Sequence, residues 1–328
     1  MRPGSDNREG MALLTVLLLV AVMSVVAVAV LDDVRFSVRR ATNAETQAQA
    51  QWYASGAEAL ARRQVGRLLA AGPARTPLEP AWNGRRLAFP IEGGSISAVV
   101  TDGQACFNLN SLVEGFGEDL LERPLGRAQF LALGRAVGAP DSRMRAVADA
   151  LTDWLDADGV SRPLGAEDGA YAGLATPYRT GGVMLAEVSE LRAVKGVDAD
   201  LYRRLRPYVC ALPTSRLSPL NVNTLTPDQA PLLMMLTDSA LGLEAASTVI
   251  ARRPRGGWPD TAAFWAQPAL ASTEAPDEVR DQVTVLTRYF NLRIDVDHGG
   301  GRAVRTALLH AQPDGAVRTV IQRWTPEE

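Results

Sequence analysis

A sharp change from polar to apolar residues divides the N-terminal end of the chain into two segments. The first ten residues form a short polar leader, and residues 11–31, which follow, contain no charged side chain. At about 1.5 Å per residue, a helix over this apolar segment would be about 30 Å long, the thickness of the hydrocarbon core of a bilayer. The pattern therefore predicts a single membrane-spanning helix near the N-terminus.

Three interpretations of this end compete. An uncleaved transmembrane anchor needs only the apolar length. An ordinary secretory signal peptide would use the small residues Ala27 and Ala29 as its cleavage pattern. The leader ending in Gly10 resembles the class III signal of type IV pilins and pseudopilins, in which a prepilin peptidase cuts after the glycine and methylates the new N-terminus. This resemblance implies cleavage between Gly10 and Met11, and it is favoured because the apolar segment is longer than the core of an ordinary signal peptide.

Helical spacing continues beyond the apolar segment and then gives way to other patterns. Apolar and small residues recur at helical spacing over residues 32–71, and Gly72 with Pro73 ends the predicted helix. Residues 73–90 are rich in proline, glycine and arginine and predict a loop, whereas alternation over residues 95–101 predicts a strand. A membrane helix that continues into an amphipathic helix is typical of a pilin stalk.

From about residue 107 to residue 281 the pattern is helical with short loops. The predicted helices cover residues 124–137, 142–155, 185–191, 199–205, 226–236 and 243–251. Strand patterns return at residues 283–287, 289–296, 302–309 and 316–324, with hairpin turns at 298–301 and 312–315. This order predicts an α+β, pilin-like fold in which a long N-terminal helix packs on an antiparallel sheet, and a large inserted all-α domain interrupts that sheet.

The helical block contains a weak internal repeat. Asn108 and Asn110 are echoed by Asn221 and Asn223, and each pair precedes a predicted helix. Asparagine is a good helix N-cap, and its side chain can close an Asx turn. The second copy, with the glycines before Trp258, resembles a helix-hairpin-helix or SAM-like module. Such modules bind DNA phosphates in cytoplasmic proteins, but the setting here favours a protein-contact or structural role.

Composition limits the possible chemistry. The 328 residues carry a net charge of −3, so the sequence offers no general basic face for nucleic acid. Both histidines, His298 and His310, fall in strand-like sequence near the C-terminus, which argues against a histidine-based catalytic or zinc site. The two cysteines, Cys106 and Cys210, form no metal motif. In an oxidising compartment they predict a disulfide, and two buried free thiols are the alternative.

The strongest chemical feature is a group of carboxylates near the middle of the chain. Its members are Asp149, Asp153, Asp156, Asp158, Glu167 and Asp168. The first three share one helix face, and the others come from a loop that can fold back onto it. Crowding carboxylates without a cation is unfavourable, and oxygen ligands in a flexible loop favour Ca²⁺. The spacing is not that of an EF-hand, because Ser161 stands where that motif requires glycine.

The sequence therefore predicts a structural Ca²⁺ site in this loop. The predicted ligands are Asp156, Asp158, Glu167 and Asp168, with Asp153 and Glu190 as lesser candidates. A solvated acidic loop is one alternative. A carboxylate-pair hydrolase is another, although neither a nucleophile motif nor a sugar-binding aromatic groove accompanies the acids.

Several short motifs, in order along the chain, resemble the GspK family, the large minor pseudopilins of type II secretion systems. They are residues 107–110 (FNLN), 151–158 (LTDWLDAD), 165–168 (GAED), Tyr171, residues 189–191 (SEL), 209–213 (VCALP) and 220–224 (LNVNT). The resemblance covers nearly the whole chain. It implies a pilin fold with an inserted α-domain that binds calcium through the acidic loops, and no enzymatic activity.

The resemblance also implies a location and partners. The chain would be a single-pass protein of the bacterial inner membrane, processed by the prepilin peptidase, with its C-terminal body in the periplasm. It would sit at the tip of the pseudopilus with the minor pseudopilins I and J and initiate assembly with the other pseudopilins. Two alternatives are a minor subunit of a type IV pilus and a membrane-anchored, metal-dependent hydrolase.

Two departures from general pilin sequences concern the N-terminal segment. Most pilins carry glutamate at the fifth mature position, where it neutralises the N-terminal amine of a neighbour, but Thr15 stands here. A subunit at the tip has no subunit beyond it to supply that amine, and an unpaired buried carboxylate would be costly. This is how the K family behaves. Glu9 stands where a basic residue more usually precedes the cleavage glycine.

These patterns divide the chain into six predicted parts. They are the leader peptide (1–10), the membrane half of the stalk helix (11–31), the rest of the stalk with the first strands (32–107), a first SAM-like part with the calcium loop (108–212), a second SAM-like part (213–281) and the C-terminal strands (282–328).

Overall fold

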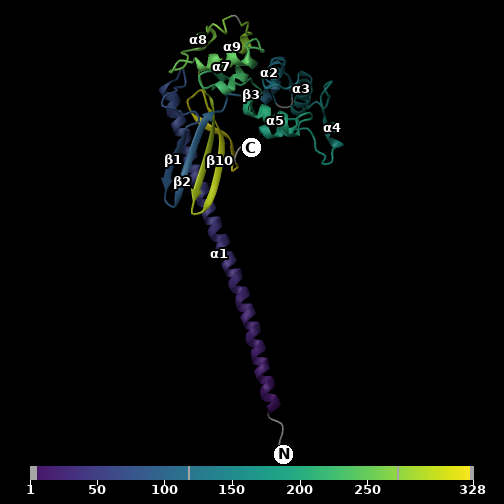
Figure 1. Cartoon of the computed structure of the whole chain (residues 1–328), viewed down its shortest axis with the longest axis vertical. Helices are drawn as coiled ribbons and strands as arrows, with labels where there is room; N and C mark the ends of the chain where they lie inside the picture. The colour runs from purple at the N-terminus through teal and green to yellow at the C-terminus, as the bar shows by residue number, and fades with distance from the viewer. Residues whose placement is uncertain (1–5, 117–118, 272, 326–328) are drawn as a thin grey trace, which may run out of the picture.

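The computed structural model describes residues 6–116, 119–271 and 273–325. A single helix, α1 (Asp6–Ala71), forms a stalk that projects from a two-part head (Figure 1). Apolar residues 11–31 lie on the projecting half, and none of them is buried within the structure. The predicted long N-terminal helix is therefore confirmed, while residues 1–5 of the predicted leader lie outside the described residues.

Helix α1 ends where the sequence predicts. The amide of Gly72 donates to the carbonyl of Leu69 at 3.1 Å. A Cβ at Gly72 would lie 2.3 Å from the carbonyl oxygen of Arg75, so only glycine allows the chain to turn this tightly.

The C-terminal half of α1 packs on one face of a five-stranded antiparallel sheet with the strand order β1-β2-β9-β10-β11. The strands are β1 (Arg86–Ile91), β2 (Gly94–Asp102), β9 (Tyr289–His298), β10 (Gly301–Ala311) and β11 (Val317–Arg323). The pilin-like α+β architecture is thereby confirmed. The prediction of a loop over residues 73–90 is wrong at its end, because β1 begins at Arg86. Pro90 disguised this strand, and it is tolerated because β1 is an edge strand.

Small residues bring the helix close to the sheet. Ala50 and Ala54 are fully buried, and they belong to one apolar core with Phe290 and Ile294 of β9. A polar interaction lies in the same interface, where Nε of Arg305 is 2.5 Å from a carboxylate oxygen of the buried Glu58. This hydrogen bond is charge-assisted and almost inaccessible to solvent, so it favours one register of α1 on the sheet.

The inserted region connects β2 to β9 and forms the second part of the head (Figure 1). Its α-helices are α2 (Pro124–Ala136), α3 (Asp141–Leu155), α4 (Asp168–Ala172), α5 (Ala199–Leu205), α6 (Ala230–Leu236), α7 (Leu243–Ala251), α8 (Thr261–Trp265) and α9 (Asp277–Gln282). Its 3₁₀ helices are η1 (Leu109–Leu112), η2 (Val188–Ala193), η3 (Arg206–Tyr208) and η4 (Pro227–Gln229). The α-helix predicted over residues 185–191 is wrong, because a 3₁₀ turn forms there instead.

The sequence predicted an all-α inserted region, and this prediction is wrong because the region also contains short strands. Three two-stranded ladders occur within it, formed by β3 (Phe107–Asn108) with β6 (Val209–Cys210), β4 (Val113–Phe116) with β5 (Asp119–Glu122), and β7 (Leu220–Asn221) with β8 (Val283–Thr284). Strand β8 covers only the start of the strand predicted at residues 283–287, and it pairs with β7 instead of the main sheet. Two or four residues are too few for a period of alternation to be recognised in the sequence.

The asparagine repeat has the same structural role in both halves of the inserted region. Asn108 and Asn221 each accept the amide of the residue two positions on through Oδ1, at 3.3 and 2.9 Å. The side chain of Asn110 then binds both the amide and the carbonyl of Leu185. Asn223 does the same to Trp258. Each buried pair thus attaches a distant loop to the first strand of its unit.

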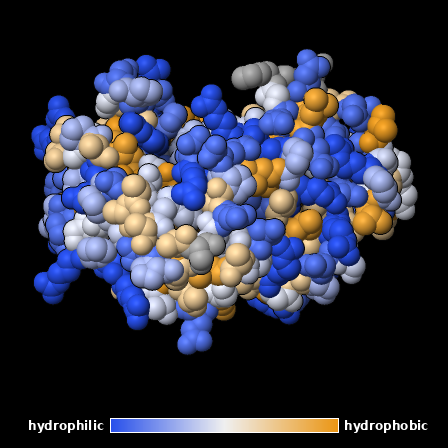
Figure 2. Space-filling view, turned by 90° about the horizontal axis from the view of Figure 1, so that it is seen from above, coloured by the Kyte–Doolittle hydropathy of each residue, from blue (hydrophilic) through white to orange (hydrophobic). Residues whose placement is uncertain are grey.

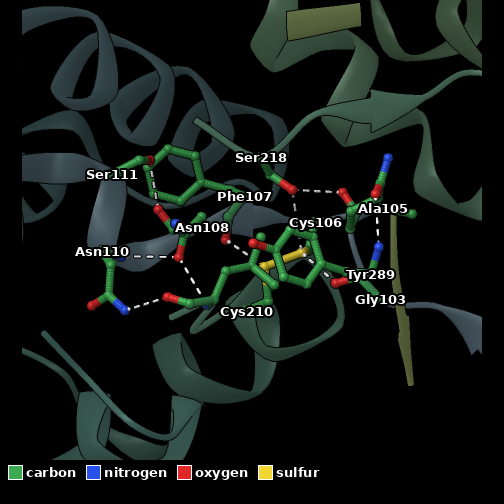
Figure 3. The surroundings of a disulfide bond; sticks show 12 residues. Gly103, Ala105, Cys106, Phe107, Asn108, Asn110, Ser111, Cys210, Ser218 and Tyr289 are labelled. Carbon is green, nitrogen blue, oxygen red and sulfur yellow. Dashed lines mark hydrogen bonds between the residues drawn. A yellow bond between two sulfur atoms is a disulfide. The ribbon is translucent and has the colours of Figure 1, made fainter. Parts of the chain in front are cut away.

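The structure joins Cys106 and Cys210 in a disulfide beside the β3–β6 ladder, with Cα atoms 5.8 Å apart (Figure 3). The bond closes a loop that contains the whole first half of the inserted region. In the same place, Oδ1 of Asn108 accepts from the amide of Leu212 at 3.0 Å.

Two side chains connect the start of the inserted region to its middle and to its end. Oδ2 of Asp102 accepts from the hydroxyls of Thr224 and Thr287, each at 2.7 Å. Oε1 of Gln104, a fully buried residue, accepts from the amides of Arg288 and Tyr289 at 2.7 and 3.1 Å. These bonds fix the orientation of the inserted region on the end of the sheet.

Candidate functional site

The acidic segment forms a compact loop at the C-terminal end of α3. Asp156 is the C-cap of this helix, and its amide donates to the carbonyl of Thr152 at 3.0 Å. Gly159 has a φ of +68°, which allows the chain to reverse direction after Asp158. The loop then returns to Glu167, the N-cap of α4.

Asp153 holds the returning segment of this loop against α3. Its carboxylate is fully buried, and Oδ2 accepts from the amide of Ala166 at 2.8 Å. A Cβ at Gly165 would lie 1.9 Å from that oxygen, so glycine is needed for the loop to come this close. The loop geometry therefore depends on a buried side chain of the helix that precedes it.

The folding of the loop brings three carboxylates together. One oxygen from each of Asp156, Asp158 and Glu167 lies within 4.8 Å of the others. Asp156 is only 2% exposed, Glu167 is half-buried and Asp158 is exposed. Oδ1 of Asp158 accepts from the amide of Val160 at 2.7 Å, which fixes the turn.

Protein donors satisfy only some of the oxygen atoms of this group. Oδ1 of Asp156 and Oε1 of Glu167 are buried and lack a hydrogen-bond partner among the described residues. Burial, and then the charges of the neighbouring carboxylates, raise the pKa of Glu167 to about 7. Burial also raises the pKa of Asp156, although its interaction with Arg162 acts in the opposite direction. Unpartnered, converging oxygen atoms suit a hard cation, so the residues present fit a metal site.

The other predicted ligands are bound elsewhere. Asp153 is committed to the loop, since Ala166 and the backbone and side chain of Arg162 donate to it. Oδ1 of Asp168 accepts from the amide and the hydroxyl of Thr180, at 2.9 and 3.0 Å. Glu190 closes the capping box of η2, and Oε1 accepts from the amide of Glu187 at 2.8 Å. The three-carboxylate group of the described residues contains none of these side chains.

The sequence interpretation missed Arg162. Its guanidinium donates to Asp153, Asp156 and Glu122, so it lies against the acidic group. A signal was present, because Arg162 is the only basic residue between Arg145 and Arg179. A lone arginine inside an acidic loop suggests an internal counter-charge.

The predicted N-terminal cleavage site lies on the stalk. The bond between Gly10 and Met11 falls within α1, which continues through it. Thr15 is exposed, and its hydroxyl donates to the carbonyl of Ala12 within the same helix at 2.8 Å.

Two models of one protein family match the inserted region. Both are described as type II secretion system protein K, and they match residues 105–214 and 220–285. Proteins named type II secretion system protein K are similar over nearly their whole length. The one from Pectobacterium carotovorum is 35% identical, with 97% of this chain and 96% of the relative covered. The one from Klebsiella pneumoniae is 36% identical, with 99% and 100% covered.

A solved structure also matches, a chain of the GspK-GspI-GspJ complex from the type 2 secretion system of enterotoxigenic Escherichia coli. The TM-score is 0.78 at 31% sequence identity, with 88% of this chain and 99% of that chain covered. The chain belongs to the type II secretion system protein K family. The resemblance found in the sequence is thereby confirmed, and the chain is a structural component of a secretion system and not an enzyme.

Proposed function

We propose that the chain forms the tip of a periplasmic pseudopilus together with the minor pseudopilins I and J. In this role it initiates assembly of the filament for the export of folded proteins across the outer membrane. The observation that carries the proposal is the match over 88% of the chain to a protein solved in complex with GspI and GspJ.

The shape of the molecule supports a terminal position. The inserted region lies at the end of the sheet that is remote from the N-terminal half of α1 (Figure 1). A subunit added beyond it would meet the inserted region and not a free stalk helix. Figure 2 shows that the face of the head seen from above is mostly hydrophilic, with apolar residues scattered over it. Such a face suits contact with solvent better than stable stacking.

The stalk supports lateral assembly. The apolar side chains of residues 11–31 are exposed along the whole projecting half of α1. Further along, Trp52 and Leu60 are 75% and 69% exposed although the opposite side of the helix packs on the sheet. Uncovered apolar side chains of this size suit packing against the stalk helices of partner subunits.

Co-purification tests the proposed complex. Full-length chain would be produced in detergent with the I-type and J-type minor pseudopilins of the same system, and with the major pseudopilin as a control. We expect a stable complex with one copy of each minor subunit, which excludes the major one. Recovery of the chain alone, or equal capture of the major pseudopilin, would contradict a tip complex.

The N-terminus of the mature protein follows from the same assignment. The prepilin peptidase removes residues 1–10 and methylates Met11, after which residues 11–31 anchor the chain in the inner membrane with its head in the periplasm. An apolar helical segment that no other described residue covers supports this single-pass arrangement. A periplasmic head is also consistent with the disulfide, since that compartment is oxidising.

The metal of the three-carboxylate group is proposed to be Ca²⁺. Asp156, Asp158 and Glu167 supply hard oxygen ligands, and the loop that carries them reverses direction at Gly159, which has a positive φ. Backbone carbonyls, such as that of Val160, and water would complete the six to eight ligands that Ca²⁺ prefers, which is about twice what Zn²⁺ takes. Bound Ca²⁺ stabilises the folded loop and supplies no reaction chemistry. Asp153, Asp168 and Glu190 are support residues in this proposal, because other donors already bind them.

The inserted region is proposed to consist of two SAM-like units that hold protein contacts and not nucleic acid. The equivalent asparagine pairs support two related units. A parallel ladder also closes each half, β3–β6 in the first and β7–β8 in the second.

A further inference from the structure

One basic side chain lies directly behind the proposed cation site. Nη1 of Arg162 donates to Oδ1 of Asp153 at 3.1 Å and to Oδ2 of Asp156 at 2.8 Å. Its Nε donates to Oε2 of Glu122, in β5, at 3.2 Å. The Arg162 side chain is 20% exposed, so it is part of the packed structure and not a surface charge. One guanidinium therefore connects the end of α3 to the β4–β5 hairpin.

This contact divides the carboxylate of Asp156 into two functional halves. Oδ2 is bound by Arg162, whereas Oδ1 is buried and lacks a hydrogen-bond partner among the described residues. The carboxylate belongs to the group that Asp158 and Glu167 complete. Because a guanidinium is planar and its donors are fixed in direction, binding one oxygen restricts rotation of the whole carboxylate.

Arg162 also compensates the charge of the anchor residue. Asp153 is fully buried, and Arg162 supplies both its backbone amide and Nη1 to it. Without this cation, Asp153 and Asp156 would be two neighbouring buried carboxylates with one fewer donor each. The loop would then have to relax to lower their repulsion.

We propose that Arg162 is a positioning residue of the cation site. It holds Asp153 and Asp156 in place so that the free oxygen of Asp156 is presented to the ion before the ion arrives. This inference rests on the proposed metal site formed by Asp156, Asp158 and Glu167.

Removing Arg162 should change the calcium affinity in the direction opposite to the one that simple electrostatics predicts. A positive charge next to the ligands repels a divalent cation, so its removal should strengthen calcium binding if Coulomb energy alone matters. If Arg162 positions the ligands, its removal should weaken binding, because the ion must then order the loop itself.

Calcium titration of full-length protein in detergent separates these outcomes. Arg162→Gln should raise the dissociation constant for Ca²⁺ about tenfold or more, the usual effect of losing a residue that orients metal ligands. Arg179→Gln is the matched control, since it removes the same charge from an 87% exposed side chain whose Nε is 3.8 Å from Asp168. It should change the constant by less than about threefold in either direction. Arg162→Lys should give an intermediate loss, because lysine keeps the charge but lacks the fork.

A second readout excludes a purely structural role. Thermal unfolding in the presence of chelator measures how far each substitution destabilises the metal-free fold. A structural role lowers the melting temperature equally with and without Ca²⁺. A positioning role makes the difference in melting temperature between the variant and the wild type larger when Ca²⁺ is present.

Each result decides the matter. Binding by Arg162→Gln that is as tight as in the wild type, or tighter, overturns the proposal. If that variant does not fold, Arg162→Lys decides alone, and an unchanged calcium affinity overturns it. Wild-type protein that binds no Ca²⁺ contradicts the metal site itself, and that result is distinguishable from a failure of Arg162 alone.

Discussion

Acidification should weaken calcium binding, because Glu167 must release a proton before it can act as a ligand. Burial and then the neighbouring carboxylates raise the pKa of this residue to about 7 in the metal-free protein. Between pH of about 8 and about 6 the ionised fraction of such a group falls about tenfold, which corresponds to about 1.4 kcal/mol of binding free energy. Burial also raises the pKa of Asp156, so the observed change should be at least this large.

Isothermal titration of metal-free, full-length protein in detergent measures this change. The calcium dissociation constant would be determined at both pH values and at constant ionic strength, since salt screens the exposed Asp158. Glu167→Gln is the control, because it should bind weakly and lose most of the pH dependence. Asp168→Asn should keep the pH dependence, since Thr180 already binds that carboxylate. A wild-type dissociation constant that is equal at both pH values would refute the role of Glu167 as a ligand.

The same pKa shift gives the metal-free protein a pH dependence of its own. The folded state binds the proton of Glu167 more tightly than the unfolded state does, because the pKa rises from 4.5 to about 7 on folding. Stability should therefore fall as the pH rises from about 4.5 to about 7 when chelator is present. Saturating Ca²⁺ should oppose this trend, since an ionised Glu167 is then a ligand. Melting curves with and without Ca²⁺ across this range should diverge as the pH rises.

Three further predictions concern processing, cross-linking and location. N-terminal sequencing of mature protein should begin at Met11, and a start at Val30 would instead indicate an ordinary signal peptidase. Thiol titration of unfolded, unreduced protein should find no free thiol, and replacing Cys106 and Cys210 with serine should lower the free energy of unfolding by about 4.7 kcal/mol, the chain-entropy value for a loop of about 100 residues. Immunogold labelling of sheared filaments should give one cluster at an end, and Thr15→Glu should not spread it along the shaft, because the inserted region would still block stacking.

The sequence predicted the larger elements well, because their periodicity extends over many residues. The stalk helix and the three C-terminal strands were found within a few residues of their observed bounds. Helices α5 and α7 were found at their observed bounds. The strand β1 was missed because Pro90 and the flanking glycines resemble a loop, and only its position at the edge of the sheet makes them acceptable.

The candidate site could be predicted in composition but not in detail. Six acids were proposed from their density and spacing, and the structure brings three of them together. Whether an acidic residue is free to bind a cation, or instead supports the loop, depends on which hydrogen-bond donors the folded chain brings near its carboxylate. Asp153 is taken by Ala166, and Asp168 by Thr180, which lies twelve residues away. Periodicity along one helix face cannot reveal such contacts, since they arise only when the loop closes.

The structure also explains how the large inserted region can keep a fixed orientation on the sheet and the stalk helix. A domain inserted between two strands is joined to the sheet by only two chain crossings, here the segment that follows β2 and the segment that precedes β9. Flexible crossings would let the domain rotate relative to the stalk. Here Asp102 and Gln104 at the first crossing bind Thr287 and Tyr289 at the second, while the disulfide closes the first half of the insertion. The proposed calcium loop lies within that closed half, far along the chain from the crossings. Metal binding would therefore stabilise the outer part of the head, and the buried polar contacts at the crossings would transmit its orientation to the sheet and to α1.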